Sequence, residues 1–405
     1  MRKENPDAAG VLNLVEQQFV ACPQPAYATL LARHRVATAA VIGAPILSRY
    51  EDVVWALRHP QLFSSQMDIH LGLGTERPMI PLQYDPPAQT RYRKILDQRF
   101  SRDRSLELEP AVRRHANQLI DGFIDQGRCE FDAAFAIPLP CRAFLSLMGL
   151  PQEDLDLFIE LKDGIIRPPV PPADLVAAFE FRRDTGQRIY AYFEGVIDAR
   201  LAEPRDDVMS YLTAAEIDGE RLTRHEILDI CFLFLLGGLD TVTASLGCML
   251  AYLAGHPEQR RRLARDPALI PSAVEELLRW ETPVMLVPRV TTQAVTVGDV
   301  ELPAGALVNL LLGAADVDEA EFSDATRVDF ARERNRHVAF GGGPHRCLGS
   351  HLARMELRAA LAEWHRRIPE YDLQPGETPR VSHGIREVQY LPLVWPADAG
   401  TAAAP

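Results

Sequence analysis

Cysteine pairs are missing from this 405-residue sequence, whose six cysteines are scattered between positions 22 and 347 without a CxxC motif. A long chain of this kind is not built on a disulfide framework, and a reducing cytoplasm suits it. Basic side chains are also scarce, because 43 lysines and arginines face 56 acidic residues, a formal net charge of −13. Nonspecific nucleic-acid binding requires a basic surface. We therefore predict a cytoplasmic protein that does not bind nucleic acid.

The features that divide a chain into domains are absent as well. Proline and glycine are spread evenly, no Ser/Gly-rich or single-charge run separates two halves, and there is no internal repeat. The first 22 residues have neither a long apolar core nor a small-residue cleavage site, which a signal peptide or anchor would need. We expect one domain over residues 1–405, with flexible ends at 1–10 and 397–405 and no membrane anchor.

Alternating strand patterns are few, and most of the chain has apolar residues at helical spacing. Helices are predicted, the first of them capped by Ser48, over residues 48–59, 89–100, 105–125 and 174–203. Strands are predicted in a hairpin at 37–48, in a Gly-Asp and Pro-Ala-Gly turn region at 287–310, and at 389–395. The fold class is therefore mainly α with a small β region.

One long apolar run, residues 226–255, has the length to span a bilayer and contains only Asp229 and Asp240 as charged residues after its first position. A membrane span would place Asp240 near its middle, at a cost of about 2.5–3.5 kcal/mol. The run also lacks flanking positive charge. A helix buried in the centre of a helical protein meets the same pattern without that cost, and we predict such a helix.

The most informative segment is FGGGPHRCLGSHLARMEL, residues 340–357, in which glycines surround Cys347 before a helix begins. Glycine lets the backbone approach a flat ligand closely. A cysteine just before a helix N-terminus is well placed to be a thiolate, because unpaired N–H groups there favour negative charge. The alternative is a glycine-rich turn around an inert buried cysteine.

Phe340, Gly343, His345, Cys347 and Gly349 match the haem-binding signature of the cytochrome P450 family. The chain resembles this family from about residue 36 to residue 395. The resemblance implies the cytochrome P450 fold, with haem b (iron protoporphyrin IX) between the central long helix and the helix after Cys347. It implies that Cys347 is the iron ligand, and that Phe340, His345 and Gly349 also contact the haem.

Gly237, Gly238, Asp240 and Thr241 lie in the middle of the long apolar run. Glycines cost about 1 kcal/mol each in a helix interior, and buried polar groups need partners. A kinked helix with a satisfied polar pair would explain them structurally. By resemblance, the glycines leave room for O₂, and Asp240 with Thr241 form the catalytic acid–alcohol pair that relays protons. Peroxide-using relatives typically lack that pair.

A clamp for the two haem propionates is implied by resemblance at Gln89 and Arg93, one helical turn apart, together with Arg289 and His345. Carboxylates at the edge of an apolar pocket require such donors. A glutamine at the position of Gln89 and the motif GGLDTV, residues 237–242, also occur in the camphor-hydroxylating branch of the family. An exposed polar helix face is the alternative for Gln89 and Arg93.

Glu276 and Arg279 form an ExxR pair, which by itself is often only a surface ion pair. The resemblance implies that they support the cysteine loop, with Arg327 as the third member of the network. The usual Asn-Arg-Asp is replaced here by Asp316-Val317-Asp318, so the local network is expected to differ.

Substrate contacts are predicted at Leu233, Leu236, Val284 and Met285, which are apolar and suit a terpenoid, fatty acyl, steroid or aromatic substrate. Arg77 is predicted to touch an acidic or carbonyl group of the substrate. The alternative is an arginine exposed on a mobile loop.

The resemblance implies insertion of one atom of O₂ into a C–H or C=C bond. Electrons must come from outside, because the chain has no flavin or iron–sulfur domain. An acidic ferredoxin is the expected partner, docking near Arg346, Arg354 and Arg358, with further basic residues at Arg91, Lys94 and Arg99. The rival classes are a haem sensor or carrier, a peroxide-driven enzyme and a membrane-anchored oxygenase.

Overall fold

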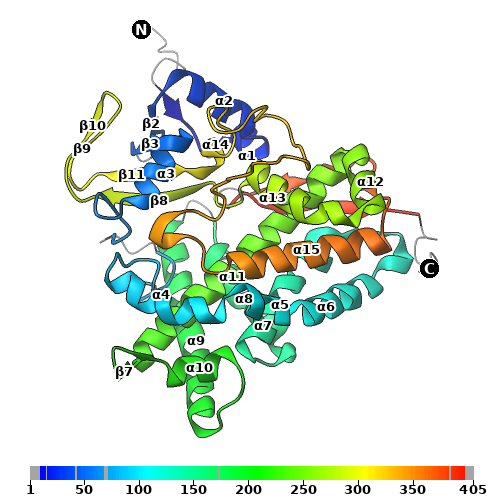
Figure 1. Cartoon of the computed structure of the whole chain (residues 1–405). Helices are drawn as coiled ribbons and strands as arrows, with labels where there is room; N and C mark the ends of the chain where they lie inside the picture. Colours follow the sequence, from blue (N-terminus) through cyan, green and yellow to red (C-terminus); the bar gives the residue numbers. More distant parts are fainter. Residues whose placement is uncertain are drawn as a thin grey trace.

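The computed structural model describes residues 10–14, 16–41, 43–67, 72–171, 174–382 and 385–396. The ends expected to be flexible, 1–10 and 397–405, lie outside the described residues except for Gly10. Figure 1 shows a mainly helical molecule whose largest sheet lies at one side with the N-terminal helices. The predicted fold class is confirmed by this arrangement.

The helices, in chain order, are α1 Gln17–Ala21, α2 Gln24–Arg33, α3 Tyr50–Arg58, α4 Ala88–Arg99, α5 Arg102–Glu107, α6 Glu109–Asp121, α7 Pro138–Met148, α8 Leu155–Ile166, α9 Leu175–Ala202, α10 Val208–Ala214, α11 Arg224–Gly255, α12 Pro257–Arg265, α13 Ile270–Glu281, α14 Leu312–Ala315 and α15 Ser350–Arg367. The short 3-10 and π helices of the described residues are η2 Ile124–Gln126, the π-helix η3 Asp132–Ala136, η4 Gln152–Asp154, η5 Pro267–Leu269 and η6 Gly343–His345.

The strands are β1 Val11–Leu12, β2 Val36–Ala39, β3 Pro45–Leu47, β4 Phe63–Ser64, β5 Arg128–Glu130, β6 Glu216–Ile217, β7 Glu220–Arg221, β8 Leu286–Thr291, β9 Val295–Val297, β10 Val300–Leu302, β11 Leu307–Leu311, β12 Asp372–Leu373, β13 Arg380–Val381, β14 Val388–Tyr390 and β15 Pro392–Val394. The largest sheet has the order β1-β2-β3-β11-β8-β4. Its β8 pairs with β11 in antiparallel register, with Arg289 opposite Val308. The predicted hairpin is β2–β3.

Two details of the predicted helices are wrong. The helix expected over 105–125 is two helices, α5 and α6, with Pro110 in the first turn of α6, where its missing N–H costs nothing. The cap of α3 is not Ser48: the N-cap is Arg49, and the carboxylate of Asp318 accepts a hydrogen bond from the Tyr50 N–H at 2.9 Å. A carboxylate distant in sequence performs the capping.

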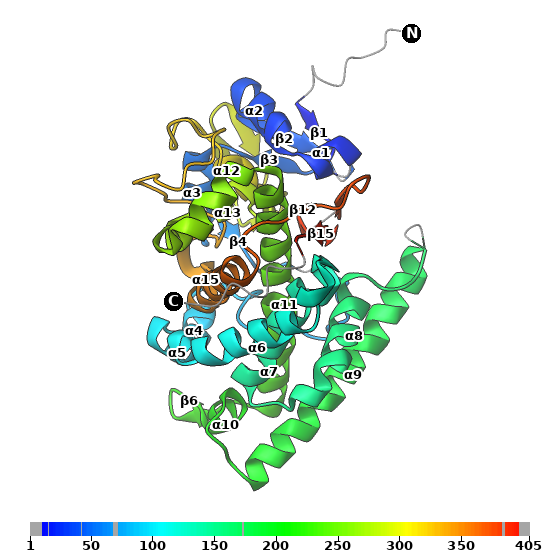
Figure 2. The ribbon, with the colours of Figure 1, turned by 90° about the vertical axis from the view of Figure 1, so that its right-hand side faces the viewer.

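Helix α11 passes through the middle of the molecule in both views (Figures 1 and 2). It is long and apolar enough to cross a membrane, yet 78% of its most apolar window is buried inside the protein. Thr223 and Glu226 form a capping box at its first turn. The prediction of a buried central helix is confirmed, and this helix forms one wall of the site described next.

Candidate functional site

A cavity lies between α11 and the segment from Ala339 to Leu357. Its wall on α11 includes Gly237, Gly238 and Thr241, and the opposite wall includes Cys347. Apolar side chains make up most of the remaining lining, among them Pro81, Leu82, Phe144, Leu147, Leu233, Val284, Val287 and Leu352. The cavity therefore suits a largely apolar occupant.

The loop that carries Cys347 is held by its backbone. The Cys347 N–H donates to the carbonyl of Phe340 at 2.8 Å, which closes the loop before α15 begins. Gly343 has φ of +62°, and a Cβ there would lie 2.0 Å from the backbone oxygen of Leu57 in α3. Only glycine fits that close approach. Burial raises the pKa of the Cys347 thiol, while the Gly349 N–H and nearby arginines act in the opposite direction.

Helix α4 supports this loop from the side. Gln89 donates to the carbonyl of Pro344 at 2.6 Å, and Arg93 donates to the carbonyl of Arg346 at 2.8 Å. Both side chains also line the cavity. The two residues share one helix face, as their spacing predicts, so one pair of side chains faces the cavity and positions the cysteine loop.

Two further basic groups near the cavity lack a close acidic partner. Arg289 is 8% exposed, and burial lowers its pKa to about 10, with Asp85 opposing the shift. His345 lines the cavity, its Nε2 has no hydrogen-bond partner, and burial together with Arg289 lowers its pKa to about 4. Asp85 approaches that nitrogen only to 3.8 Å. Two carboxylates from a bound group would supply the missing partners, so these residues fit a haem.

The structure separates the two members of the predicted relay. Thr241 lines the cavity, and its Oγ donates to the carbonyl of Gly237 at 2.9 Å. Asp240 is fully buried and is not among the residues that line the cavity. Its Oδ1 accepts from Lys162 and from Arg167, each at 3.0 Å. Thr241 can therefore contact a ligand, whereas Asp240 is bound to two cations of the α8 region.

The ExxR pair is buried, and its third partner differs from the prediction. Glu276 binds Arg279 at 2.8 Å, and Arg332 approaches Glu276 at 3.0 Å. Arg327 is exposed and contributes only its carbonyl, which accepts from Arg279 at 3.0 Å. The prediction for Arg327 is therefore wrong, because the chain turns so that Arg332, five residues later, points inward.

The predicted substrate residues are only partly brought together. Leu233 and Val284 line the cavity. Leu236 and Met285 do not, since both are buried in hydrophobic clusters beside it. Arg77 also lies outside the lining and is bound to Asp229 of α11 at 2.9 Å. Its predicted contact with an acidic substrate group is not supported, because its charge is already compensated.

Glu356 was not anticipated. It is the one carboxyl-bearing residue in the cavity lining within the described ranges, and its Oε2 has no hydrogen-bond partner. Burial raises its pKa well above the usual value. An acid placed between Met355 and Leu357 on a predicted apolar helix face was the available sequence signal. Lys162, Arg167 and Glu387 were also missed, because no local pattern connects them to Asp240.

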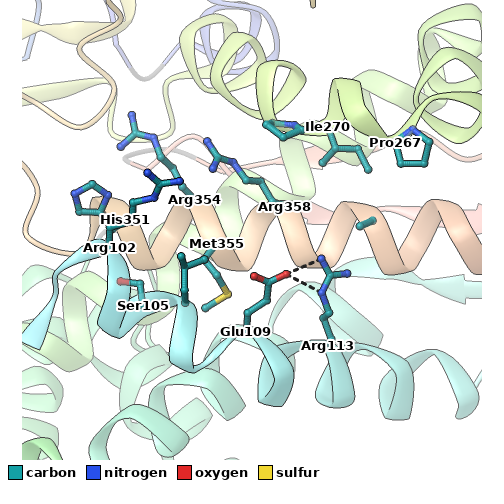
Figure 3. Close-up of a pocket in the computed structure, with 13 residues that line it drawn as sticks. Arg102, Ser105, Glu109, Arg113, Pro267, Ile270, His351, Arg354, Met355 and Arg358 are labelled. Carbon is teal, nitrogen blue, oxygen red and sulfur yellow. Dashed lines mark hydrogen bonds and ion pairs between the residues drawn. The ribbon is translucent and has the colours of Figure 1, made fainter.

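A basic groove lies on the outer side of α15, against α5, α6 and the start of α13 (Figure 3). Arg102, His351, Arg354 and Arg358 line it, and we call it the arginine groove. Arg354 and Arg358 both bind Glu275, at 2.8 and 3.1 Å. Two of the predicted docking arginines are therefore partly neutralised.

Of the other predicted docking residues, Arg346 and Lys94 are exposed and form no ion pair in the described part of the chain, and the same is true of Arg102. Arg91 binds Asp218 at 3.1 Å, and Arg99 stacks on Tyr211 at 4.3 Å. Burial lowers the pKa of His351, and the Arg346, Arg354, Arg102 and Arg358 charges act in the same direction. The uncompensated positive charge therefore centres on Arg346, Lys94 and Arg102.

Comparisons with known proteins agree with this geometry. The cytochrome P450 family model matches residues 173–267 and 268–379. Cytochrome P450 130 of Mycobacterium tuberculosis (strain ATCC 25618 / H37Rv) is 36% identical over 338 residues, which cover 81% of this chain and 82% of that protein. The vitamin D(3) 25-hydroxylase of Pseudonocardia autotrophica is 35% identical over 364 residues, 87% of this chain and 88% of that protein.

The cytochrome P450 CYP109Q5 from Chondromyces apiculatus has a similar solved structure. Its TM-score is 0.86 at 30% sequence identity, and the superposition covers 95% of this chain and 98% of that chain. Sequence and fold similarity thus extend over nearly the same length.

Proposed function

Because the chain belongs to the cytochrome P450 family and is a haem-dependent monooxygenase, we propose that it oxidises a small-to-medium, uncharged and largely apolar substrate. One atom of O₂ enters a C–H or C=C bond, and the other leaves as water with two electrons and two protons. The observation that carries this proposal is the cavity that has Cys347 on one wall and Thr241 on the other, with apolar side chains around them. When bound, the haem supplies the chemistry of O–O cleavage, which a thiolate ligand favours.

The residues around the cavity have separate roles in this proposal. Cys347 would ligate the iron through its sulfur, and Phe340 and Gly349 would contact the haem. Gln89, Arg93, Arg289 and His345 would hold its propionates. Support comes from Arg289 and His345, which are buried without a close acidic partner, because such groups are costly unless a ligand completes them. Arg93 already binds Asp97 at 2.8 Å.

Substrate binding rests on shape and apolar contact. Leu233 of α11 and Val284 line the cavity, and Pro81, Leu82 and Val287 add to its apolar lining. Glu356 has no ionic partner in the described chain and is expected to be neutral, so no charged anchor is available there. A terpenoid, fatty acyl, steroid or aromatic molecule fits this lining, and the name of the Pseudonocardia relative gives a lipophilic example.

Proton delivery is assigned to Thr241 and Asp240. Thr241 lines the cavity, and Asp240 is its neighbour on α11. A haem sensor or carrier would not need such a pair, and a peroxide-driven enzyme would not need to take up protons in this way. The pair favours the O₂-dependent reaction over both alternatives.

The experiment is a comparison of Thr241→Ala with Thr243→Ala. Thr243 is a buried threonine of the same helix whose Oγ donates to the Ala136 and Leu239 carbonyls. With Thr241→Ala we expect unchanged substrate binding and a several-fold rise in hydrogen peroxide per reductant consumed. Thr243→Ala should keep the product yield of the parent protein. An unchanged yield in Thr241→Ala would contradict the assignment.

Electrons are proposed to come from an external acidic ferredoxin that docks at the arginine groove and Arg346, with the protein working in the cytoplasm. The uncompensated charges of Arg346 and Arg102 support this docking face, because opposite charge steers encounter between proteins. Arg354 and Arg358 border the same face but share Glu275. They are expected to contribute less than Arg346.

A further inference from the structure

The arginine groove is a cavity of about 480 Å³, separate from the cavity beside Cys347, which we call the haem cavity. Figure 3 shows side chains of α5, α6, α13 and α15 gathered around it. Among the described residues none lines both cavities, because they lie against different faces of α15. Glu356 lines the haem cavity, whereas Met355 and Arg358 of the same helix line the groove. The groove has the volume of pockets that hold small organic molecules.

Part of the groove lining is apolar. Leu106 of α5 is 44% exposed and lines the groove together with the buried side chains of Ile270 and Met355. Pro267 and Pro271 add to this apolar lining. Apolar surface that is open to water in a concave site favours a ligand with an apolar body, because burying such surface is favourable. The groove can therefore hold the apolar part of a ligand.

Two of the four arginines in the lining are already compensated. Arg113 binds Glu109 at 2.7 Å and Glu363 at 2.6 Å. Glu109 is the one carboxylate that lines the groove within the described ranges, and this contact holds it. Arg354 binds Glu275 at 2.8 Å through its Nε and through its Nη2. These two arginines need no ligand, and Glu109 is not left as a free negative charge.

The other two arginines keep donors for a ligand. Arg102 is exposed and forms no ion pair in the described part of the chain. Arg358 shares Glu275 with Arg354, is 39% exposed, and has an Nε without a hydrogen-bond partner. Burial lowers the pKa of His351, and the neighbouring arginine charges act in the same direction. A buried donor without an acceptor is costly, and an anion supplies acceptors to a guanidinium.

We propose that the arginine groove binds a small organic acid, a single anionic group on an apolar body. The anionic group contacts Arg102 and Arg358, and the apolar body packs on Leu106, Ile270 and Met355. Such a ligand differs from the uncharged substrate proposed for the haem cavity. Because an acidic ferredoxin is proposed to dock at the same groove, a bound acid should compete with it. This consequence rests on the proposed function, whereas the binding itself does not.

The test uses anilinonaphthalene sulfonate (ANS), which carries one sulfonate on an apolar body, and the full-length, haem-loaded protein. Phenylimidazole is added first, because its nitrogen binds the haem iron and its ring fills the haem cavity. Equilibrium dialysis then measures how many ANS molecules bind and how tightly. We expect one per protein. Phenylnaphthylamine, the same body without the sulfonate, should bind several-fold more weakly.

Variants separate the two parts of the site. Arg102→Gln should weaken ANS several-fold and leave phenylnaphthylamine unchanged, and Leu106→Ser should weaken both ligands. The matched controls are Arg183→Gln and Leu201→Ser on α9, where these side chains are 51% and 54% exposed. Neither control should change the binding of ANS. All four side chains are exposed, and the Soret band of each variant checks that it has folded around haem.

Competition is measured as the rate of reduction by an acidic ferredoxin with and without ANS. Saturating ANS should slow reduction several-fold and leave the substrate-induced Soret shift unchanged. In Leu106→Ser, which keeps the arginines, the same slowing should require several-fold more ANS. A ligand bound in the haem cavity would change the Soret shift instead.

The inference is overturned if neither Arg102→Gln nor Leu106→Ser changes the affinity for ANS, or if phenylimidazole abolishes ANS binding. If Arg346→Glu still slows reduction in that case, the proposed ferredoxin docking stands and only the ligand site is wrong. If ANS binds in the groove and reduction is unchanged, the ligand site stands, the competition is refuted and the ferredoxin docks at another surface.

Discussion

Glu356 shows how one buried residue can affect both stability and the site. It lies on α15 between two buried apolar residues, lines the cavity and has an oxygen without a partner. An ionised carboxylate in such a place is strongly disfavoured. Burial therefore favours the neutral form of this side chain and raises its pKa.

We predict that Glu356→Gln makes the protein more stable at neutral pH. The folded-state pKa of Glu356 is raised above the ordinary 4.5. The Glu356 carboxyl therefore makes its full contribution to stability below pH 4.5 and loses it as pH rises through the folded-state pKa. The variant should have a higher free energy of unfolding at pH 8, on the order of 1 kcal/mol or more, and a smaller difference at pH 5. Urea unfolding at both pH values measures this.

Glu363→Gln on the same helix is the matched control, and we expect it to change the free energy of unfolding in the opposite direction. Burial pushes the pKa of Glu363 up, but hydrogen bonds from Asn117, Arg366 and Arg113 outweigh this and lower it. That group contributes stability above its unfolded pKa, so its loss should destabilise the protein at neutral pH. Equal effects of the two substitutions would contradict the account of Glu356.

At the scale of elements, the segment 72–84 packs on α9 and α11. Arg77 binds Asp229 of α11 at 2.9 Å, and its guanidinium lies 5.1 Å from the ring centre of Tyr190 on α9. A Cβ at Gly186 of α9 would come within 2.1 Å of the Gly74 carbonyl, so the two backbones touch. Pro81 and Leu82 of the same segment line the cavity.

We predict that Arg77→Ala loosens this segment without changing which ligands bind. Loss of the ion pair with Asp229 should speed hydrogen exchange in residues 72–84. It should weaken the binding of acidic and neutral ligands by similar factors. Glu76→Gln is the control, because Glu76 is exposed and only 3.9 Å from Arg77. Selective loss of acidic ligands would instead restore Arg77 as a substrate anchor.

At the scale of the whole molecule, charge is distributed unevenly. The chain carries a net charge of −13, yet the arginine groove and Arg346 form a positive face beside the cysteine loop. Figure 2 shows α15 and α9 on opposite sides of α11. A substitution on α9 can therefore serve as a control for one on the positive face.

We predict that reduction by an acidic ferredoxin slows as salt rises to physiological strength, where the screening length is about 8 Å. Arg346→Glu should slow reduction several-fold at low salt and leave substrate affinity unchanged. Arg183→Glu on α9, which reverses a 51%-exposed arginine bound to Asp184, should have little effect. Reduction rates are measured by stopped flow. If they change neither with salt nor in Arg346→Glu, the ferredoxin binds at another surface.

Much of the fold was predictable because its signals are local. Apolar spacing along the chain predicted α3, α4, α9 and α11, since one helix face must meet the core. The glycines and Cys347 of the loop are adjacent in sequence, and their geometry depends mainly on their own backbone. The confirmed fold class and the predicted cysteine loop rest on such short-range patterns.

Contacts between distant segments could not be predicted in the same way. Arg332 instead of Arg327 binds Glu276, and Leu233 but not Leu236 faces the cavity, because a small rotation of a segment changes which side chain points inward. Sequence by itself determined the helices and the signature around Cys347. Only the tertiary structure placed Lys162 and Arg167 beside Asp240, because buried charges are paired by three-dimensional packing, not by their spacing along the chain.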